Sequence, residues 1–361
     1  MNPVYAILRK RLDDFASGYP ATAGGVEIRL LKKLFTEEEA ELFARLSPLA
    51  ETPDAAARRL GRDPDRLAIV LERMAAKGLL FRIKKGDQAR YAAIPFVPGI
   101  YDFQVSSMDP ILAQDVQDYT EQGFGRTIQG HQTPIMRTIP IKRELVVQWP
   151  VAPYEDALAI VDRQKVIAVA PCICRKKGEM LERGCGKPLE TCLMFGYQAH
   201  FYVDNGMGRY IDKAAAARII EQSDAAGLVL QPFNARDMGV LCSCCGDCCE
   251  MLGSLKRQPK PAEAVKSNYY AQVSEDACSG CATCEDRCQM DAITVADDRA
   301  VVDRARCIGC GLCVTTCPTG AVALVKKDPA EQYRPPQNTA ETFMRLAVER
   351  NKTLLPASPA S

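Results

Sequence analysis

The sequence predicts an α+β chain of several domains, with a helix-rich amino-terminal module, a cysteine-rich α/β centre and a small carboxy-terminal domain. Its 361 residues, 47% hydrophobic and 25% charged, suit two or three globular domains. All 17 cysteines lie beyond residue 171, nine in the centre and eight in a duplicated spacing near the carboxy terminus. Helical periodicity instead dominates residues 36–78.

Proline-containing segments at 94–103, 148–156 and 256–265 mark the expected junctions between domains. Residues 104–150 show no clear pattern, and the chain is expected to end in one helix and a frayed terminus. The predicted domains are an amino-terminal module, a central domain, a small cysteine-repeat domain and a tail, at residues 1–103, 104–264, 265–327 and 328–361.

The amino-terminal module should contain three helices followed by a hairpin. The first helix opens with Thr36 and has Glu39 three residues later, which is a capping-box pattern. A second helix is expected over 52–61, with a threonine cap and a closing glycine, and a third over 63–78. Residues 79–94 then predict two strands joined by a polar turn.

Three helices and a hairpin in this order resemble a winged helix-turn-helix domain. The segment 58–90 has ten basic and four acidic residues, a balance of 10 − 4 = +6. Such a patch could contact DNA phosphates, although winged helices also serve in protein docking and dimerisation. The bases are Arg58, Arg59, Arg62, Arg66, Arg73, Lys77, Arg82, Lys84, Lys85 and Arg90.

The duplicated spacing is C-x2-C-x2-C-x3-C, in "CSGCATCEDRC" and again in "CIGCGLCVTTC". Three thiolates two residues apart can surround one iron-sulfur cubane, while the fourth ligand comes from the other repeat. Paired zinc sites are the alternative, because C-x2-C pairs also bind zinc. Residues 270 to 325 resemble bacterial two-cluster ferredoxins.

This resemblance implies two [4Fe-4S] clusters with crossed ligands. One would take Cys278, Cys281, Cys284 and Cys317, and the other Cys307, Cys310, Cys313 and Cys288. Glycines expected to supply positive φ near the clusters are Gly280, Gly309, Gly311 and Gly320. The sequence departs from the ferredoxin pattern at Gln289, where proline is usual and where the second repeat has Pro318.

Residues 270–325 also have eight acidic residues, from Glu275 to Asp303, against four arginines. An acidic face of this kind could dock a basic redox partner.

The nine central cysteines also favour metal clusters, because they lie in groups beside glycine and charge rather than singly in apolar segments. One grouping forms a cubane from the first four and another from four of the last five, but a mixed grouping is also open. Together they could hold one or two further iron-sulfur clusters. The nine are Cys172, Cys174, Cys185, Cys192, Cys242, Cys244, Cys245, Cys248 and Cys249.

The stretch "CSCCGDCC" at 242–249 allows two local conformations. A sharp turn at Gly246 would separate adjacent cysteines, whereas a helix would pair them four residues apart on adjoining faces. Its "CCG" is similar to an element of heterodisulfide reductase-like subunits, although the long spacers and closing pair of that pattern are missing.

Between the cysteine groups, residues 196–211 predict an extended piece and a glycine turn, followed by a helix near 212–226. The only two histidines, His131 and His200, are expected to be packed or solvated rather than ligands. The basic run 175–177 could moderate cluster charge, but a solvated face is the simpler expectation.

The whole chain resembles multidomain iron-sulfur proteins of anaerobic bacteria and archaea that join a cysteine-rich domain to a terminal ferredoxin. This implies a cytoplasmic electron-transfer component of an oxidoreductase system, with a redox partner protein and no membrane span. A redox-sensing DNA-binding regulator and a reductase with substrate at the central cluster are the alternatives. Catalytic residues and homodimer formation are left open.

Overall fold

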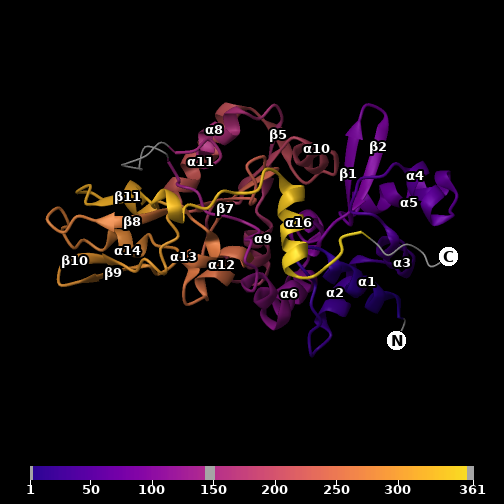
Figure 1. Ribbon diagram of the computed structural model, residues 1–361, viewed down its shortest axis with the longest axis horizontal. Helices are drawn as coiled ribbons and strands as arrows, with labels where there is room; N and C mark the ends of the chain where they lie inside the picture. Colours follow the sequence, from indigo (N-terminus) through magenta and orange to yellow (C-terminus); the bar gives the residue numbers. More distant parts are fainter. Residues whose placement is uncertain (1–2, 143–150, 356–361) are drawn as a thin grey trace.

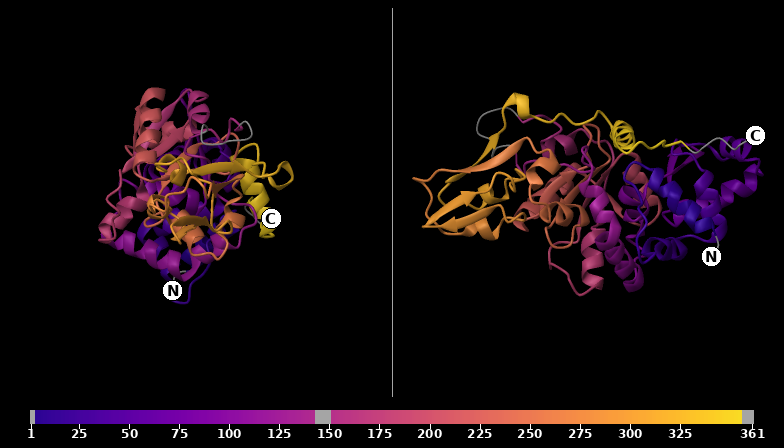
Figure 2. Two further views of the ribbon diagram at one scale, coloured as in Figure 1. Left: turned by 90° about the vertical axis from the view of Figure 1, so that its left-hand side faces the viewer. Right: turned by 60° about the horizontal axis from the view of Figure 1, so that its bottom comes forward.

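The computed structural model describes residues 3–142 and 151–355 of the chain. The molecule is elongated, with the amino-terminal module at one end, the central domain in the middle and the carboxy-terminal domain at the other end (Figures 1 and 2). Among the described residues, no helix has the length and apolar character needed to cross a membrane.

The amino-terminal module contains the predicted three helices and hairpin, preceded by two further helices that pack on them. The capping box is confirmed, because Thr36 Oγ1 accepts the Glu39 N–H while the Glu39 carboxylate accepts the Thr36 N–H. Gly61 ends its helix at φ 65°, as expected for a glycine cap. The elements are α1 (Val4–Asp14), α2 (Val26–Leu34), α3 (Glu37–Arg45), α4 (Pro53–Leu60), α5 (Pro64–Ala76), β1 (Leu80–Lys85) and β2 (Gln88–Ala93).

The hairpin packs against the central domain. The Phe81 ring on β1 lies 5.0 Å from the Phe201 ring, centroid to centroid. Arg82 on the same strand is buried and ion-pairs with Glu72 and with Asp204 of the central domain. The module therefore shares a core with the centre instead of standing apart.

A run of short turns and helices leads from the hairpin across the centre. It covers much of the segment for which the sequence predicted no structure. These elements are η1 (Phe96–Ile100), η2 (Asp102–Gln104), α6 (Pro110–Tyr119), η3 (Thr120–Phe124) and α7 (Gly125–Gln129). Residues 143–150 lie outside the described part, including the start of the expected junction at 148–156.

The central domain is built on a five-stranded sheet in the order β5-β3-β4-β7-β6. All its strand pairs are antiparallel, so the α/β expectation holds only in the sense of mixed helices and strands. The strands are β3 (Ile167–Pro171), β4 (Glu190–Phe195), β5 (Arg209–Ile211), β6 (Val229–Pro232) and β7 (Val240–Cys244). The helices are α8 (Ala157–Asp162), α9 (Ile173–Met180), α10 (Tyr197–Asp204), α11 (Lys213–Ala225), α12 (Glu250–Lys256) and α13 (Pro261–Val265).

Two expectations for this domain were wrong. Residues 197–204 form helix α10 rather than an extended piece, because burial of Phe201 and Tyr202 outweighs the strand preference of their aromatic side chains. The helical alternative for "CSCCGDCC" is also wrong. Its first three residues end β7, and a turn through Gly246 leads to α12.

The carboxy-terminal domain repeats one unit twice, as the sequence predicted. Strand β8 pairs antiparallel with β11, and β9 pairs with β10. One short helix in each repeat contains the third cysteine and precedes the fourth. The elements are β8 (Tyr269–Val273), α14 (Thr283–Asp286), β9 (Ile293–Ala296), β10 (Arg299–Val302), α15 (Leu312–Thr315) and β11 (Val322–Lys326).

Residues 328–355, which we call the strap, then run back along the molecule to the amino-terminal module (Figure 2). The strap contains η5 (Pro329–Glu331) and the predicted terminal helix, α16 (Thr339–Glu349). The Arg236 and Asp237 amides of the centre donate to strap carbonyls at 2.8 and 2.9 Å. Residues 356–361, where fraying was expected, lie outside the described part.

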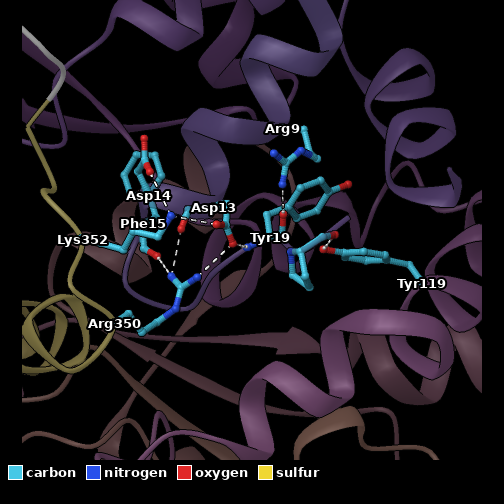
Figure 3. A network of polar contacts seen from close by, with 9 residues as sticks. Arg9, Asp13, Asp14, Phe15, Tyr19, Tyr119, Arg350 and Lys352 are labelled. Atoms are coloured by element: carbon cyan, nitrogen blue, oxygen red, sulfur yellow. Dashed lines mark hydrogen bonds and ion pairs between the residues drawn. The ribbon is translucent and has the colours of Figure 1, made fainter. Parts of the chain in front are cut away.

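The end of the strap is held by the carboxylates of α1 (Figure 3). Arg350 donates to the Asp13 carboxylate at 2.9 Å and to the Phe15 carbonyl at 2.6 Å. Lys352 Nζ lies 2.9 Å from Asp13 and 3.2 Å from Asp14. These contacts join segments more than 330 residues apart in the sequence.

We predict that Arg350→Ala lowers the stability of α1 by about 2 kcal/mol, because it removes several hydrogen bonds to a partly buried charge. Hydrogen exchange of the α1 amides measures this loss. Arg345→Ala on the same helix is the control. Its exposed pair with Glu341 should contribute only about 0.3–0.5 kcal/mol. Equal effects of the two substitutions would contradict the prediction.

Candidate metal centres

One set of carboxy-terminal cysteines surrounds a hollow at the far end of the molecule. Cys278, Cys281, Cys284 and Cys317 line it together. This is the crossed set that the duplicated spacing implies, with three cysteines from the first repeat and one from the second. Cys281 is exposed, so the hollow lies close to the surface. We call this set the outer site.

The other carboxy-terminal set faces the central domain. Cys288, Cys307 and Cys310 pack against the same hydrophobic core as Cys244 and Cys249 of the centre. Burial raises the pKa of Cys310 to about 12. We call Cys288, Cys307, Cys310 and Cys313 the inner site.

The backbone around both carboxy-terminal sites is suited to binding iron-sulfur clusters. The Ala271 N–H points at Cys307 Sγ at 3.3 Å, and the Ala300 N–H points at Cys278 Sγ at 3.4 Å. Such N–H···S bonds stabilise cluster sulfurs. Gly309 adopts φ 66°, and a Cβ there would lie 2.2 Å from the Tyr269 carbonyl oxygen. Only glycine fits this position.

Six central cysteines lie close enough together to shift one another's pKa values around a closed ring, which we call the thiol ring. The order around the ring is Cys172, Cys174, Cys249, Cys244, Cys242 and Cys192, with the last next to the first. They come from the start of α9, from β4 and β7, and from the N-cap of α12.

The sheet register places part of this ring. Leu193 pairs with Leu241 across β4 and β7, so the antiparallel register sets Cys192 opposite Cys242. Cys244 follows two residues later and therefore shares a face of the strand with Cys242. The mixed grouping of the sequence analysis is the one that the structure brings together.

Charge in the ring concentrates on two thiols. Hydrogen bonds from Cys192 and Cys244 lower the pKa of Cys242 to about 6. Hydrogen bonds from Cys174 and Cys244 lower the pKa of Cys249, which also accepts the Leu252 N–H at 3.4 Å. Thiolates are the form that binds iron or zinc, so the ring has the donor chemistry of a metal centre.

A buried arginine lies beside the ring. Arg175 is 1% exposed and donates to the Ser243 carbonyl at 2.9 Å and to Thr191 Oγ1. Burial lowers its pKa, but negative charge on the surrounding cysteines has the larger combined effect and raises the pKa above its ordinary value. Its Nε has no hydrogen-bond partner among the described residues.

The expectation of a solvated basic face was therefore wrong for Arg175. It was also wrong for Lys177, which is 3% exposed and ion-pairs with Glu250. Both cations are buried because the thiol-rich centre and its neighbouring acid supply the opposite charge. They balance charge there, as the sequence analysis had considered.

Other residues near the ring were missed by the sequence analysis. Tyr101 and Asp102 come from a segment that looked only like a proline-rich junction, and Tyr202 comes from α10. Burial raises the pKa of Asp102 to about 6, and its carboxylate accepts the Gly99 N–H at 2.8 Å. Burial raises the pKa of Tyr202, and Asp102 and the nearby ring cysteines add to this rise. No local motif marks these three residues, because only the fold brings them to the ring.

The three remaining central cysteines lie together in a second set. Cys185, Cys245 and Cys248 have Sγ atoms within 4.8 Å of one another. Cys185 was expected beside Cys172, Cys174 and Cys192 in one of the two groupings, but its Sγ instead lies 3.8 Å from Cys245 Sγ. The nine central cysteines thus divide into six and three.

Neither histidine belongs to a metal-binding set among the described residues. Burial lowers the pKa of His131 to about 4, so this side chain is neutral at pH 7. His200 is exposed and hydrogen-bonds with Tyr210 at 2.8 Å.

The basic segment of the amino-terminal module is largely neutralised. Six of its ten bases have acidic partners. For two of these six, the acidic partners include Asp204 of the central domain. This arrangement supports docking within the molecule and leaves DNA binding without structural support. The six are Arg59, Arg62, Arg73, Lys77, Arg82 and Lys84.

Residues 271–324 match a family model described as a 4Fe-4S dicluster domain. The chain is therefore an iron-sulfur protein with a ferredoxin-type domain, and the paired-zinc alternative for the duplicated spacing loses support. No curated protein and no solved structure matches the chain significantly.

We predict that Cys192→Ser removes iron from the centre and leaves the dicluster domain loaded with about eight irons. A serine oxygen replaces one thiolate of the ring, whereas the outer and inner sites keep all their cysteines. Iron analysis with EPR spectroscopy measures both pools. Ser243→Ala is the control, because Ser243 Oγ contacts Ser223 instead of the ring. Unchanged iron in the Cys192 variant would contradict a metal centre at the ring.

Proposed function

We propose that the protein is an electron-transfer component in which single electrons pass from a partner to the outer cluster, the inner cluster and a further iron-sulfur centre at the thiol ring. The observation that carries this proposal is the common core of the inner site and the ring. Clusters exchange electrons by close approach, so a shared core supports direct transfer without a diffusing carrier.

The outer site supports docking of a basic partner protein. Glu275, Asp276, Asp297 and Asp298 are exposed near it, and Arg299 pairs with Glu275 at 2.7 Å. An acidic surface beside a shallow cluster attracts and orients a partner of opposite charge.

Gln289 supports transfer from the inner site to the centre. It follows Cys288 directly, and its Oε1 accepts the N–H of Gly246 at 2.8 Å. Gly246 in turn lies two residues after Cys244 of the thiol ring. The departure from the usual proline therefore supplies a hydrogen bond between two cysteine-bearing segments, which a proline side chain could not make.

Three further contacts keep the domains in this arrangement. Arg287 ion-pairs with Asp224 on α11, and Thr315 donates to the same carboxylate at 2.8 Å. The Ile141 N–H donates to the carbonyl of Cys310 at 2.9 Å. The inner site is fixed against the centre from several sides.

The amino-terminal module and its linker support the same function by covering the centre. Tyr101 and Asp102 lie over the ring, and the hairpin holds this segment through Phe81, whose ring stacks on Phe103. Burial of the ring limits solvent access and helps to set the potential of a bound cluster.

We predict that Gln289→Leu slows reduction of the central centre several-fold without changing iron content, because it removes the acceptor for Gly246. The measurement is rapid-freeze EPR after mixing the anaerobic holoprotein with a limiting one-electron reductant. Gln289→Glu keeps an acceptor oxygen and is the matched control, with its cluster potentials measured by titration.

A central signal that becomes reduced as fast in the leucine variant as in the wild type would exclude this contact from the path. The dicluster domain could become reduced while the wild-type centre stays oxidised, even at a solution potential below that of the centre. In that case the proposed function itself is wrong.

A further inference from the structure

Cys185, Cys245 and Cys248 are packed more tightly than cubane ligands. All their Sγ atoms lie within 4.8 Å of one another, and no other set of three potential metal-binding side chains within 3–142 and 151–355 is so compact. The eight cysteines of the dicluster domain lie in the same ranges and form no such set. A cubane holds its thiolates further apart than a single ion does. The dicluster cysteines therefore serve, within the same chain, as the reference with which the spacing of these three cysteines is compared.

The spacing fits a single tetrahedral ion. With a zinc–sulfur distance of about 2.3 Å, two thiolates on one tetrahedral zinc lie about 3.8 Å apart. The measured distance from Cys185 Sγ to Cys245 Sγ is 3.8 Å. One pair of sulfurs therefore lies at the separation that one ion would impose, and the other two pairs lie within 4.8 Å.

The local sequence supports such a site. Cys245 and Cys248 form a C-x2-C pair, a common spacing of zinc ligands. The Cys248 N–H donates to Cys245 Sγ at 3.4 Å, a bond that stabilises the thiolate. Gly178 on α9 leaves the space, because a Cβ there would lie 3.0 Å from Cys248 Sγ.

The set is open on one side. Cys245 and Cys248 are buried, whereas Cys185 is half-buried in an exposed loop at residues 182–188. Among the described residues, no fourth cysteine, histidine or carboxylate joins the set. Structural zinc sites are closed by four protein ligands, and an open position admits solvent or a small ligand.

We propose that Cys185, Cys245 and Cys248 bind one zinc ion, separate from the iron centres, with an exchangeable fourth ligand from solvent. Zinc has no redox chemistry and takes no part in the electron path. It fixes the exposed loop to the turn that contains Gly246.

The test begins with zinc and iron analysis of the full chain, purified anaerobically. We expect about one zinc per chain, and zinc-edge X-ray absorption should give three sulfur ligands at about 2.3 Å and one lighter ligand. Cys185→Ser should lose zinc and keep iron. Cys192→Ser should lose central iron and keep zinc.

Loss of iron instead of zinc in the Cys185 variant would overturn the proposal and assign the three thiolates to an iron-sulfur cluster. Four sulfur ligands on the zinc would overturn the open position. If the Cys185 variant does not fold, the wild-type protein still decides. Replacement of zinc by cobalt should give a tetrahedral thiolate spectrum that shifts on adding cyanide, and an unchanged spectrum counts against an exchangeable ligand.

Discussion

The antiparallel register of β4 on β7 is the constraint on which the centre depends. It sets Cys192 opposite Cys242 and places Cys244 on the same face of its strand. A slip of one residue would turn these side chains to the opposite face of the sheet and open the ring. Cys172 and Cys249, at the N-termini of α9 and α12, can then complete the ring because the ends of β3 and β7 and the chain after them hold these two residues there.

Burial of so many thiols is possible only because opposite charge is buried with them. An isolated thiolate in an apolar core is costly, and so is an isolated guanidinium. Arg175 meets both needs by lying within the field of several ring sulfurs while it also donates to a carbonyl and a hydroxyl. Lys177 and Glu250 add a second balanced pair at the edge of the centre.

The sequence predicted those features that depend on neighbouring residues. The capping box at Thr36 and the two cysteine repeats are local patterns, so their elements and spacing could be predicted directly. Pairing of Cys192 with Cys242 depends on a strand register across 50 residues, and spacing alone could not choose the grouping. Asp102 reaches the ring through the packing of a different domain, which no motif in its own segment records. The role of Gln289 was visible only as a departure from a pattern, until its partner Gly246 was known.

The strap also orders the assembly of the molecule in time. Ribosomal synthesis runs from the amino terminus, so α1 leaves the ribosome long before Arg350 and Lys352 exist. Until then the carboxylates of Asp13 and Asp14 lack these two cations, and the amino-terminal module is held by its own packing and by its contacts with the central domain. The strap can close only after the cysteine segments have been made, and its closure joins the ends of the first and last helices.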